Sequence, residues 1–255
     1  MRKRFKEMLR GILEFLRRHL STKNPLLPYY ILIFLNIIIF VVGVNVFVGL
    51  TEGLSGAPMK GFDKQVTDFV TSFRTPELNR FFQFITDLGD VYAYIVATTI
   101  VAIFFFFKLK NKKFIFQLLG ILILSALANI ALKKAINRAR PTIEHLVVVK
   151  SLSYPSGHAM SATAFYGFLI YLVFKIKMNK WLKGFLMVLF GFLILLIGTS
   201  RIYLGVHFPS DVVGGFLAGL IWVAFCIVLF NIVSLLRERK AMVDPTVEKE
   251  EIIEE

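Results

Sequence analysis

The sequence predicts an all-α membrane protein with six transmembrane helices, and three observations support this fold class. Of its 255 residues, 56% are hydrophobic and only 18% are charged, and the mean hydropathy is +0.70. An ordinary soluble domain has roughly 45–50% apolar and about 25% charged residues. The third observation is a series of long segments without Asp, Glu, Lys or Arg. Together these features exclude a typical soluble globular domain.

The uncharged segments define the six spans. A helix needs about 20 mainly apolar residues to cross a bilayer, and a charge at mid-bilayer costs roughly 2.5–3.5 kcal/mol. The spans are approximately residues 28–50, 91–107, 114–132, 159–174, 184–199 and 212–236. Residues 28–237 are therefore expected to form one domain. The single cysteine, Cys226, lies in an apolar run, so the chain can form neither an intrachain disulfide nor a cysteine-based zinc site.

Basic residues predict the orientation of the spans. Residues 1–23, 108–113 and 175–183 carry eight, four and four Lys or Arg residues, and loops rich in these residues stay cytoplasmic. Both termini are then cytoplasmic, in a plasma or bacterial inner membrane. The same rule accounts for the net charge of +13, so nucleic acid is not an expected partner. The outer segment 133–158 nevertheless carries five basic residues, which indicates that they serve another purpose.

The two ends of the chain and one outer segment are expected to lie outside the bilayer core. Residues 1–23 alternate apolar and basic side chains at helical spacing, which predicts an amphipathic helix on anionic lipid headgroups. Residues 238–255 predict an acidic, disordered tail. In residues 52–90, helical spacing predicts helices that cover the outer face. The apolar residues concerned are Val66, Phe69, Val70, Phe73, Leu78, Phe81, Phe82 and Ile85.

The first polar cluster at the outer face is KKAINRARP, residues 133–141. If the helix of the third span continues outward, Lys133, Asn137 and Arg140 share one face and Arg138 points elsewhere. Pro141 disfavours helical geometry at Arg140, which places two cations at the end of this face. Taken alone, such a cluster is better explained by lipid-headgroup anchoring.

The second cluster is YPSGH, residues 154–158, directly before the fourth span. Ser156 is a good N-cap, and Gly157 lets the backbone approach a ligand. The start of a helix offers unpaired N–H groups and a partial positive charge to an anion. His158 lies on the first turn. Alone, the cluster is an ordinary turn and cap.

The third cluster is SRIYLGVHFPSD, residues 200–211, between the fifth and sixth spans. His207 and Asp211 are four residues apart, so the carboxylate can accept an imidazole N–H and make the other ring nitrogen a better nucleophile. Arg201 adds a third cation that can grip two phosphate oxygens. All three clusters fall on one predicted face. Together they supply what metal-free phosphoryl transfer needs, namely charge neutralisation, a nucleophile and an acid.

These residues resemble the tripartite signature of the type 2 phosphatidic acid phosphatase superfamily. The match covers residues 133–211, and its three parts keep the family spacing. They are Lys133, six residues and Arg140-Pro141; Pro155-Ser156-Gly157-His158; and Ser200-Arg201, five residues, His207, three residues and Asp211. The six-span layout is similar to that of the family's lipid phosphatases.

The resemblance implies a role for each matching residue. His207 would attack phosphorus to give a phosphohistidine, Asp211 would orient it, and His158 would protonate the leaving alkoxide. The phosphoryl oxygens would be bound by Lys133, Arg140, Ser156, Gly157 and Arg201. No metal or other cofactor is required in this family. The partners would be a lipid phosphate and membrane lipids, with the active site on the extracytoplasmic, periplasmic face.

Several alternatives stay open on the sequence alone. Candidate substrates are phosphatidylglycerol phosphate, undecaprenyl diphosphate and lipid A phosphate. A phosphotransferase would pass the phosphoryl group to another lipid, and a transporter or channel would use the polar residues as an ion path. A metal-dependent hydrolase would use His158, His207 and Asp211 as ligands, although the nearby cations argue against it. The oligomeric state is also open. His145 matches no signature position and is a candidate headgroup contact.

Overall fold

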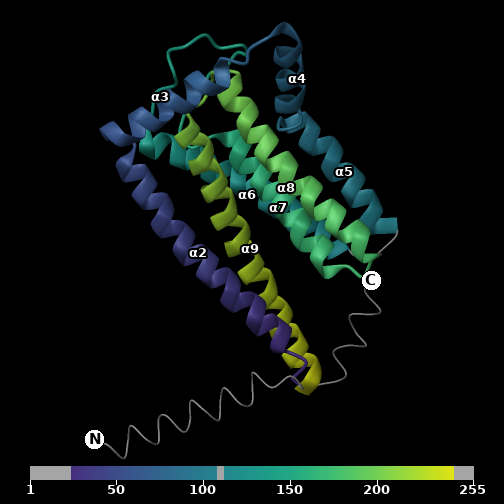
Figure 1. The fold of residues 1–255 in the computed structure, drawn as a ribbon. Coiled ribbons are helices and arrows are strands. Elements are labelled where there is room, and N and C mark those ends of the chain that lie inside the picture. Colours follow the sequence, from purple (N-terminus) through teal and green to yellow (C-terminus); the bar gives the residue numbers. More distant parts are fainter. Residues whose placement is uncertain (1–23, 108–111, 244–255) are drawn as a thin grey trace, which may run out of the picture. The chain divides into compact units, whose positions relative to one another are not determined.

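The structure is a computed structural model that describes residues 24–107 and 112–243. This part of the chain contains eight helices and no strand (Figure 1). They are α2 (Leu27–Gly53), α3 (Ala57–Thr71), α4 (Pro76–Asp87), α5 (Val91–Phe107), α6 (Lys112–Ile136), α7 (Gly157–Lys175), α8 (Lys180–Tyr203) and α9 (Pro209–Val243). The expected amphipathic helix 1–23 and residues 244–255 of the expected tail lie outside the described residues.

The helices confirm the predicted membrane architecture. Five of those described, α2, α6, α7, α8 and α9, are long and apolar enough to cross a bilayer. The sixth candidate span is the pair α4 and α5, which are bent by 56° at a short break. The helix α9 continues to Val243, past the expected boundary at residue 237. Apolar side chains on the outer surfaces of these helices are exposed, as contact with lipid requires.

The chain divides into two compact units. Residues 39–223 form one unit, and the described parts of the two chain ends, 24–38 and 224–243, belong to the other. Every expected site residue lies in the first unit. All residues of α3 to α8 belong to it, together with the first part of α9 up to Val223.

Helix α7 forms the centre of the first unit. It packs against α6 and α8, and more than half of its residues are buried. The beginning of α9 also approaches it closely, because a Cβ atom on Gly215 would lie 2.6 Å from the Ser156 carbonyl oxygen. At Gly219 a Cβ would lie 2.6 Å from Cβ of Thr163. Small residues at helix contacts are how membrane helices pack tightly, and this contact fixes the start of α7 against the start of α9.

Residues 52–90 form two helices, as predicted. Helix α3 begins with Pro58 in its first turn, and α4 begins after Thr75, whose side chain accepts a hydrogen bond from the Leu78 N–H at 3.2 Å. Tyr203 ties this region to α8. Its ring stacks on Phe82 at 4.2 Å between centroids, and its hydroxyl donates to Asn79 Oδ1 at 2.8 Å. Helix α4 is thereby fixed next to the end of α8.

Candidate active site

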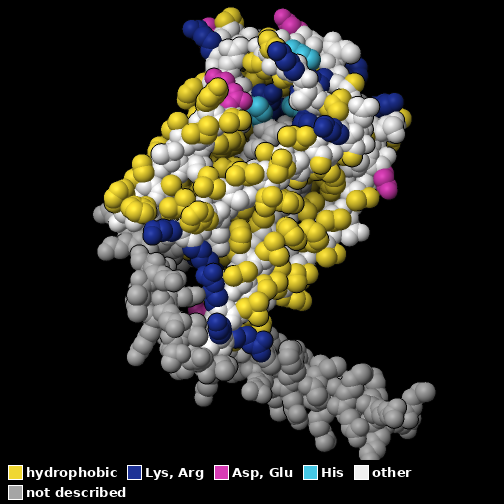
Figure 2. All heavy atoms as spheres, turned by 180° about the vertical axis from the view of Figure 1, so that it is seen from behind, with side chains coloured by type: hydrophobic (Ala, Val, Ile, Leu, Met, Phe, Trp, Pro, Cys, Tyr) yellow, Lys and Arg dark blue, Asp and Glu magenta, His cyan; other side chains and the backbone are white. Residues whose placement is uncertain are grey.

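The three polar clusters lie at one end of the helices of the first unit. They occupy the loop after α6, the first residues of α7, the last residues of α8 and the turn into α9 (Figure 1). Backbone hydrogen bonds connect them, from Ser153 N to Arg138 O at 2.9 Å and from Ser156 N to Asp211 O at 2.9 Å. Figure 2 shows histidine side chains next to Lys and Arg side chains in a hollow of the surface. The sequence-distant clusters are therefore parts of one region.

His207 is almost completely buried, with a relative exposure of 2%. Its Nδ1 atom lies 3.4 Å from Asp211 Oδ2 and 3.4 Å from Ser153 Oγ, and its Nε2 atom lies 3.3 Å from Nη1 of Arg140. Burial lowers the pKa of His207 to about 3, and the charges of Arg201 and Arg140 act in the same direction against the opposing effect of Asp211. The imidazole is therefore neutral at neutral pH. A proton on Nδ1 facing the carboxylate leaves a lone pair on Nε2.

Asp211 is fully buried and accepts hydrogen bonds on both carboxylate oxygens. Oδ2 accepts from the Phe208 N–H at 2.8 Å and from the Ser153 hydroxyl at 2.5 Å, and Oδ1 accepts from Nη1 of Arg138 at 2.6 Å. A carboxylate with this many donors stays ionised and keeps one orientation. It can therefore hold the His207 ring and stabilise a positive charge on it.

The prediction that Arg138 points elsewhere is wrong. Helix α6 ends at Ile136, and Asn137 adopts a positive φ of 51° while its N–H bonds to the Lys133 carbonyl at 2.9 Å. Asn is one of the few residues that adopts this backbone conformation readily. The helical face from Lys133 through Arg140 therefore does not form. The chain turns instead, and Arg138 points toward Asp211.

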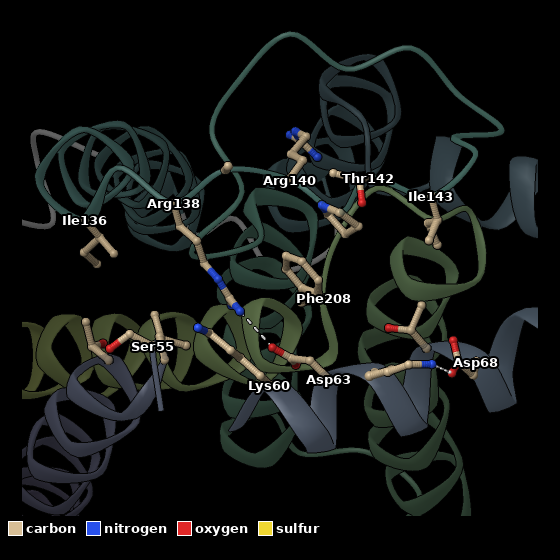
Figure 3. Close-up of a pocket in the computed structure, with 16 residues that line it drawn as sticks. Ser55, Lys60, Asp63, Asp68, Ile136, Arg138, Arg140, Thr142, Ile143 and Phe208 are labelled. Atoms are coloured by element: carbon tan, nitrogen blue, oxygen red, sulfur yellow. Dashed lines mark hydrogen bonds and ion pairs between the residues drawn. The ribbon is translucent and has the colours of Figure 1, made fainter. Parts of the chain in front are cut away.

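Arg138 also connects the site to α3. Its Nη2 atom donates to Oδ2 of Asp63 at 2.8 Å, the bond drawn in Figure 3. Asp63 is 2% exposed, and it also accepts from the backbone N–H of Ser210 at 2.8 Å and from the Ser210 hydroxyl at 2.7 Å. The guanidinium carbon of Arg138 lies 4.5 Å from the centre of the Phe208 ring. One buried network thus joins α3, the loop after α6 and the start of α9.

Sequence reasoning missed Asp63, Arg138 and Ser153. A signal for Asp63 existed, because it lies three and seven residues before Val66 and Val70, on the apolar face of α3. A carboxylate on a buried helix face must have a charged or hydrogen-bonding partner. Its partner lies 75 residues away along the chain, so the sequence pattern alone does not identify it.

Two of the expected phosphate-binding cations surround the loop before α7. Lys133 donates from Nζ to the carbonyl oxygens of Leu152 and Ser153, the second at 3.3 Å. Arg140 donates from Nε to the Ser151 carbonyl at 2.6 Å and from Nη1 to the Val206 carbonyl at 2.6 Å. Burial lowers the pKa of Arg140, and the charge of Asp211 opposes that effect. Lys133 and Arg140 converge as expected, although on a loop rather than on one helix face.

Arg201, the third cation, is 4% exposed and lies at the end of α8. Its Nη1 atom donates to Thr86 Oγ1 at 2.5 Å, and its Nε atom has no partner within the described part of the chain. The charges of Arg140 and Arg201 act on both His158 and His207. Both arginines are therefore near the histidines of the second and third clusters.

The start of α7 departs in one respect from the expected anion site. Ser156 holds the N-cap position with extended backbone angles, but its side chain makes no capping hydrogen bond. Its buried Oγ atom has no partner among the described residues. A Cβ on Gly157 would lie 3.0 Å from Asn129 Oδ1, so a glycine suits this close approach. The Ser156 hydroxyl and the first N–H groups of α7 therefore remain available to an anion.

The two remaining histidines near the site have different surroundings. His158 is on the first turn of α7, its side chain is 21% exposed, and Nε2 lies 2.8 Å from Oδ1 of Asp90. His145 is exposed, and its Nε2 atom lies 2.9 Å from the Pro141 carbonyl oxygen. His145 thus stabilises the fold of its own loop.

A cavity of about 670 Å³ opens beside Arg138 and Arg140. Figure 3 shows Lys60 and Asp63 of α3 along one wall, with Phe208 between them and Arg140. Leu54, Ile136 and Ile143 supply apolar lining. The cavity can accommodate a polar headgroup with an attached apolar portion.

The fold and these contacts define a class of protein, a helical membrane protein with a histidine, carboxylate and arginine site suited to phosphoryl groups. Comparisons with known proteins agree. The model of the PAP2 superfamily matches residues 114–233. Phosphatidylglycerophosphatase B of Bacillus subtilis is 33% identical over 178 residues, which are 69% of this chain and 86% of that protein. An undecaprenyl-diphosphatase of Sulfolobus acidocaldarius is 27% identical over 177 residues, 68% of this chain and 80% of that protein.

Solved structures show the same similarity. The crystal structure of a transmembrane PAP2-type phosphatidylglycerolphosphate phosphatase from Bacillus subtilis aligns with a TM-score of 0.70 and 31% identity, covering 75% of this chain and 95% of the other. Aquifex aeolicus LpxE aligns with a TM-score of 0.52 and 27% identity, covering 64% and 93%. The chain belongs to the PAP2 superfamily, as a membrane phosphatase.

Proposed function

We propose that the protein removes a phosphate monoester, or the terminal phosphate of a diphosphate, from a lipid through a phosphohistidine on His207. The observation that carries this proposal is the setting of the His207 ring, with Asp211 3.4 Å from Nδ1 and Arg140 3.3 Å from Nε2. One side of the ring is oriented by a carboxylate. The other offers a lone pair next to a cation that can hold the phosphoryl group under attack.

The reaction has two steps. In the first, Nε2 of His207 forms a bond to phosphorus, the bond from phosphorus to the lipid oxygen breaks, and His158 gives that oxygen a proton. In the second, water attacks the phosphohistidine, gives a proton to His158, and releases inorganic phosphate from His207. Lys133, Arg140, Arg201, the Ser156 hydroxyl and the Gly157 backbone would bind the phosphoryl oxygens. Positioned cations supply most of the stabilisation in such a transition state.

The same cations favour a reaction without a metal ion. Lys133, Arg140 and Arg201 place three positive groups around the site, and they would repel a divalent cation. They also provide the charge neutralisation that a metal would otherwise supply. No cofactor is therefore part of the proposal.

Purified protein in detergent should release inorganic phosphate in excess chelator and should be inhibited by vanadate. The substrates to be assayed are phosphatidylglycerol phosphate, undecaprenyl diphosphate and a lipid A phosphate. The first two are the substrates for which two of the relatives are named. Loss of activity with chelator, restored by one metal, would contradict the metal-free reaction. Transfer of radiolabel between lipids without phosphate release would indicate a phosphotransferase.

We also propose that the site faces the extracytoplasmic side of the membrane. The opposite ends of α6, α7 and α8 carry Lys residues, which favour the cytoplasmic side. Val148 lies in the loop between α6 and α7 and is 89% exposed. In Val148→Cys, the new thiol should react with a membrane-impermeant maleimide in intact cells. A cysteine in place of Lys177, between α7 and α8, should react only after permeabilisation. The reverse labelling pattern would place the site on the cytoplasmic side.

A further inference from the structure

The corner between α4 and α5 contacts two of the proposed site residues, although it belongs to none of the three sequence clusters. Thr86, near the end of α4, accepts the hydrogen bond from Arg201 Nη1 at 2.5 Å. A Cβ on Gly89 would lie 2.9 Å from Cδ2 of His158, so the backbone packs directly against the imidazole. Asp90, the last residue before α5, completes this corner.

Asp90 contacts the histidine itself. Its Oδ1 atom lies 2.8 Å from Nε2 of His158, and the two side chains are 51% and 21% exposed. Asp90 directly precedes α5, and its backbone carbonyl accepts a hydrogen bond from the Tyr94 N–H at 3.1 Å, as an N-cap residue does. An Asp at this position commonly accepts a further hydrogen bond on its side chain from the first backbone N–H groups of the helix. In the described part of the chain its carboxylate instead contacts His158. The carboxylate is therefore directed at the site rather than at its own helix.

The charged groups around His158 indicate how this contact affects protonation of the ring. The groups that act on it are Asp90 from the α4–α5 corner, Arg201 from α8 and Arg140 from the loop after α6. Burial has the largest effect and disfavours a proton on the ring, and the two arginines act in the same direction, whereas the Asp90 carboxylate favours the proton. A general acid must carry a proton when the leaving oxygen departs.

We propose that Asp90 is the positioning residue for the general acid, fixing the His158 ring and supporting its protonated form. This inference rests on the proposed function, in which His158 gives its proton to the leaving oxygen and recovers one from water. The site then contains two histidine–carboxylate pairs. Asp211 orients the nucleophile, and Asp90 orients the acid from a different part of the chain.

The test uses the full chain and compares the lipid phosphate that it hydrolyses fastest with an aryl phosphate whose leaving group needs little protonation. Asp90→Asn keeps the size and the helix-capping ability of the side chain but removes its charge. It should lower kcat for the lipid phosphate about 10- to 100-fold, with KM changed by less than about threefold, and should affect the aryl phosphate much less. Glu77→Gln, the corresponding change of a carboxylate that is 74% exposed at the start of α4, should stay within about twofold of the unchanged protein.

Coupling to His158 separates positioning from a purely structural role. The double variant Asp90→Asn/His158→Ala should be no slower than His158→Ala alone, because both changes remove the same proton transfer. Independent, multiplying losses would overturn the proposal. So would an Asp90→Asn variant that behaves like Glu77→Gln while the loss in His158→Ala remains confined to the lipid phosphate. If His158→Ala hydrolyses both substrates at the original rate, the acid role in the proposed function fails as well.

Discussion

His207→Ala is expected to lower kcat for lipid phosphate hydrolysis by at least about 10³-fold, because no other group replaces the attacking nitrogen. Substrate binding should change much less, since the cations and the start of α7 remain. The measurements are phosphate release at saturating substrate and acid-labile radiolabel on protein quenched during turnover. Label should be present in the unchanged protein and absent from the variant.

His145→Ala is the matched control for this experiment. His145 is exposed and bonds to the Pro141 carbonyl at 2.9 Å, so its removal should leave kcat within about twofold. A His207→Ala variant with normal turnover would remove the nucleophile from the proposal.

The second large effect is expected at Arg138, which lies between two buried carboxylates. Its guanidinium donates to Asp211 at 2.6 Å and to Asp63 at 2.8 Å, and its side chain is 16% exposed. Removing one partner from a buried ion pair typically costs about 3–5 kcal/mol, because the remaining charge stays buried. Arg138→Met should therefore lower the apparent Tm in detergent strongly. It should also lower kcat in the fraction that stays folded, since Asp211 loses a donor.

Two further variants test this explanation. Arg80→Met removes an arginine whose side chain is 78% exposed, and it should change stability by no more than about 0.5 kcal/mol. The double variant Asp63→Asn/Arg138→Met should be more stable than Arg138→Met, because a neutral amide replaces an unpaired carboxylate. Additive losses from Asp63→Asn and Arg138→Met would contradict the coupling between α3 and Asp211.

The membrane spans could be predicted from the sequence because burying a charge in the bilayer is costly, so that each span is a long segment without Asp, Glu, Lys or Arg. The bend between α4 and α5 has no comparable pattern in the sequence. At the site, the spacing of His207 and Asp211 was sufficient to predict their pairing, because four residues keep two side chains close. Ser153, which lies between them in space, comes from a loop more than fifty residues earlier.

The wrong prediction for Arg138 and the failure to identify Asp90 have a common physical cause. The orientation of Arg138 depends on one backbone angle at Asn137, and a helical wheel drawn past that residue assigns the wrong face. The contact of Asp90 with His158 depends on how α4 and α5 meet α7. Both are properties of tertiary packing, which residue spacing within one segment does not contain.

The hydrogen-bond acceptors of Lys133 and Arg140 affect how related enzymes can diverge in sequence. Both side chains donate largely to main-chain carbonyls of residues 151–153 and 206, which every amino acid provides. Side chains along this stretch can therefore be exchanged while the cations keep their places. Selectivity for a new headgroup can then evolve beside an unaltered reaction centre.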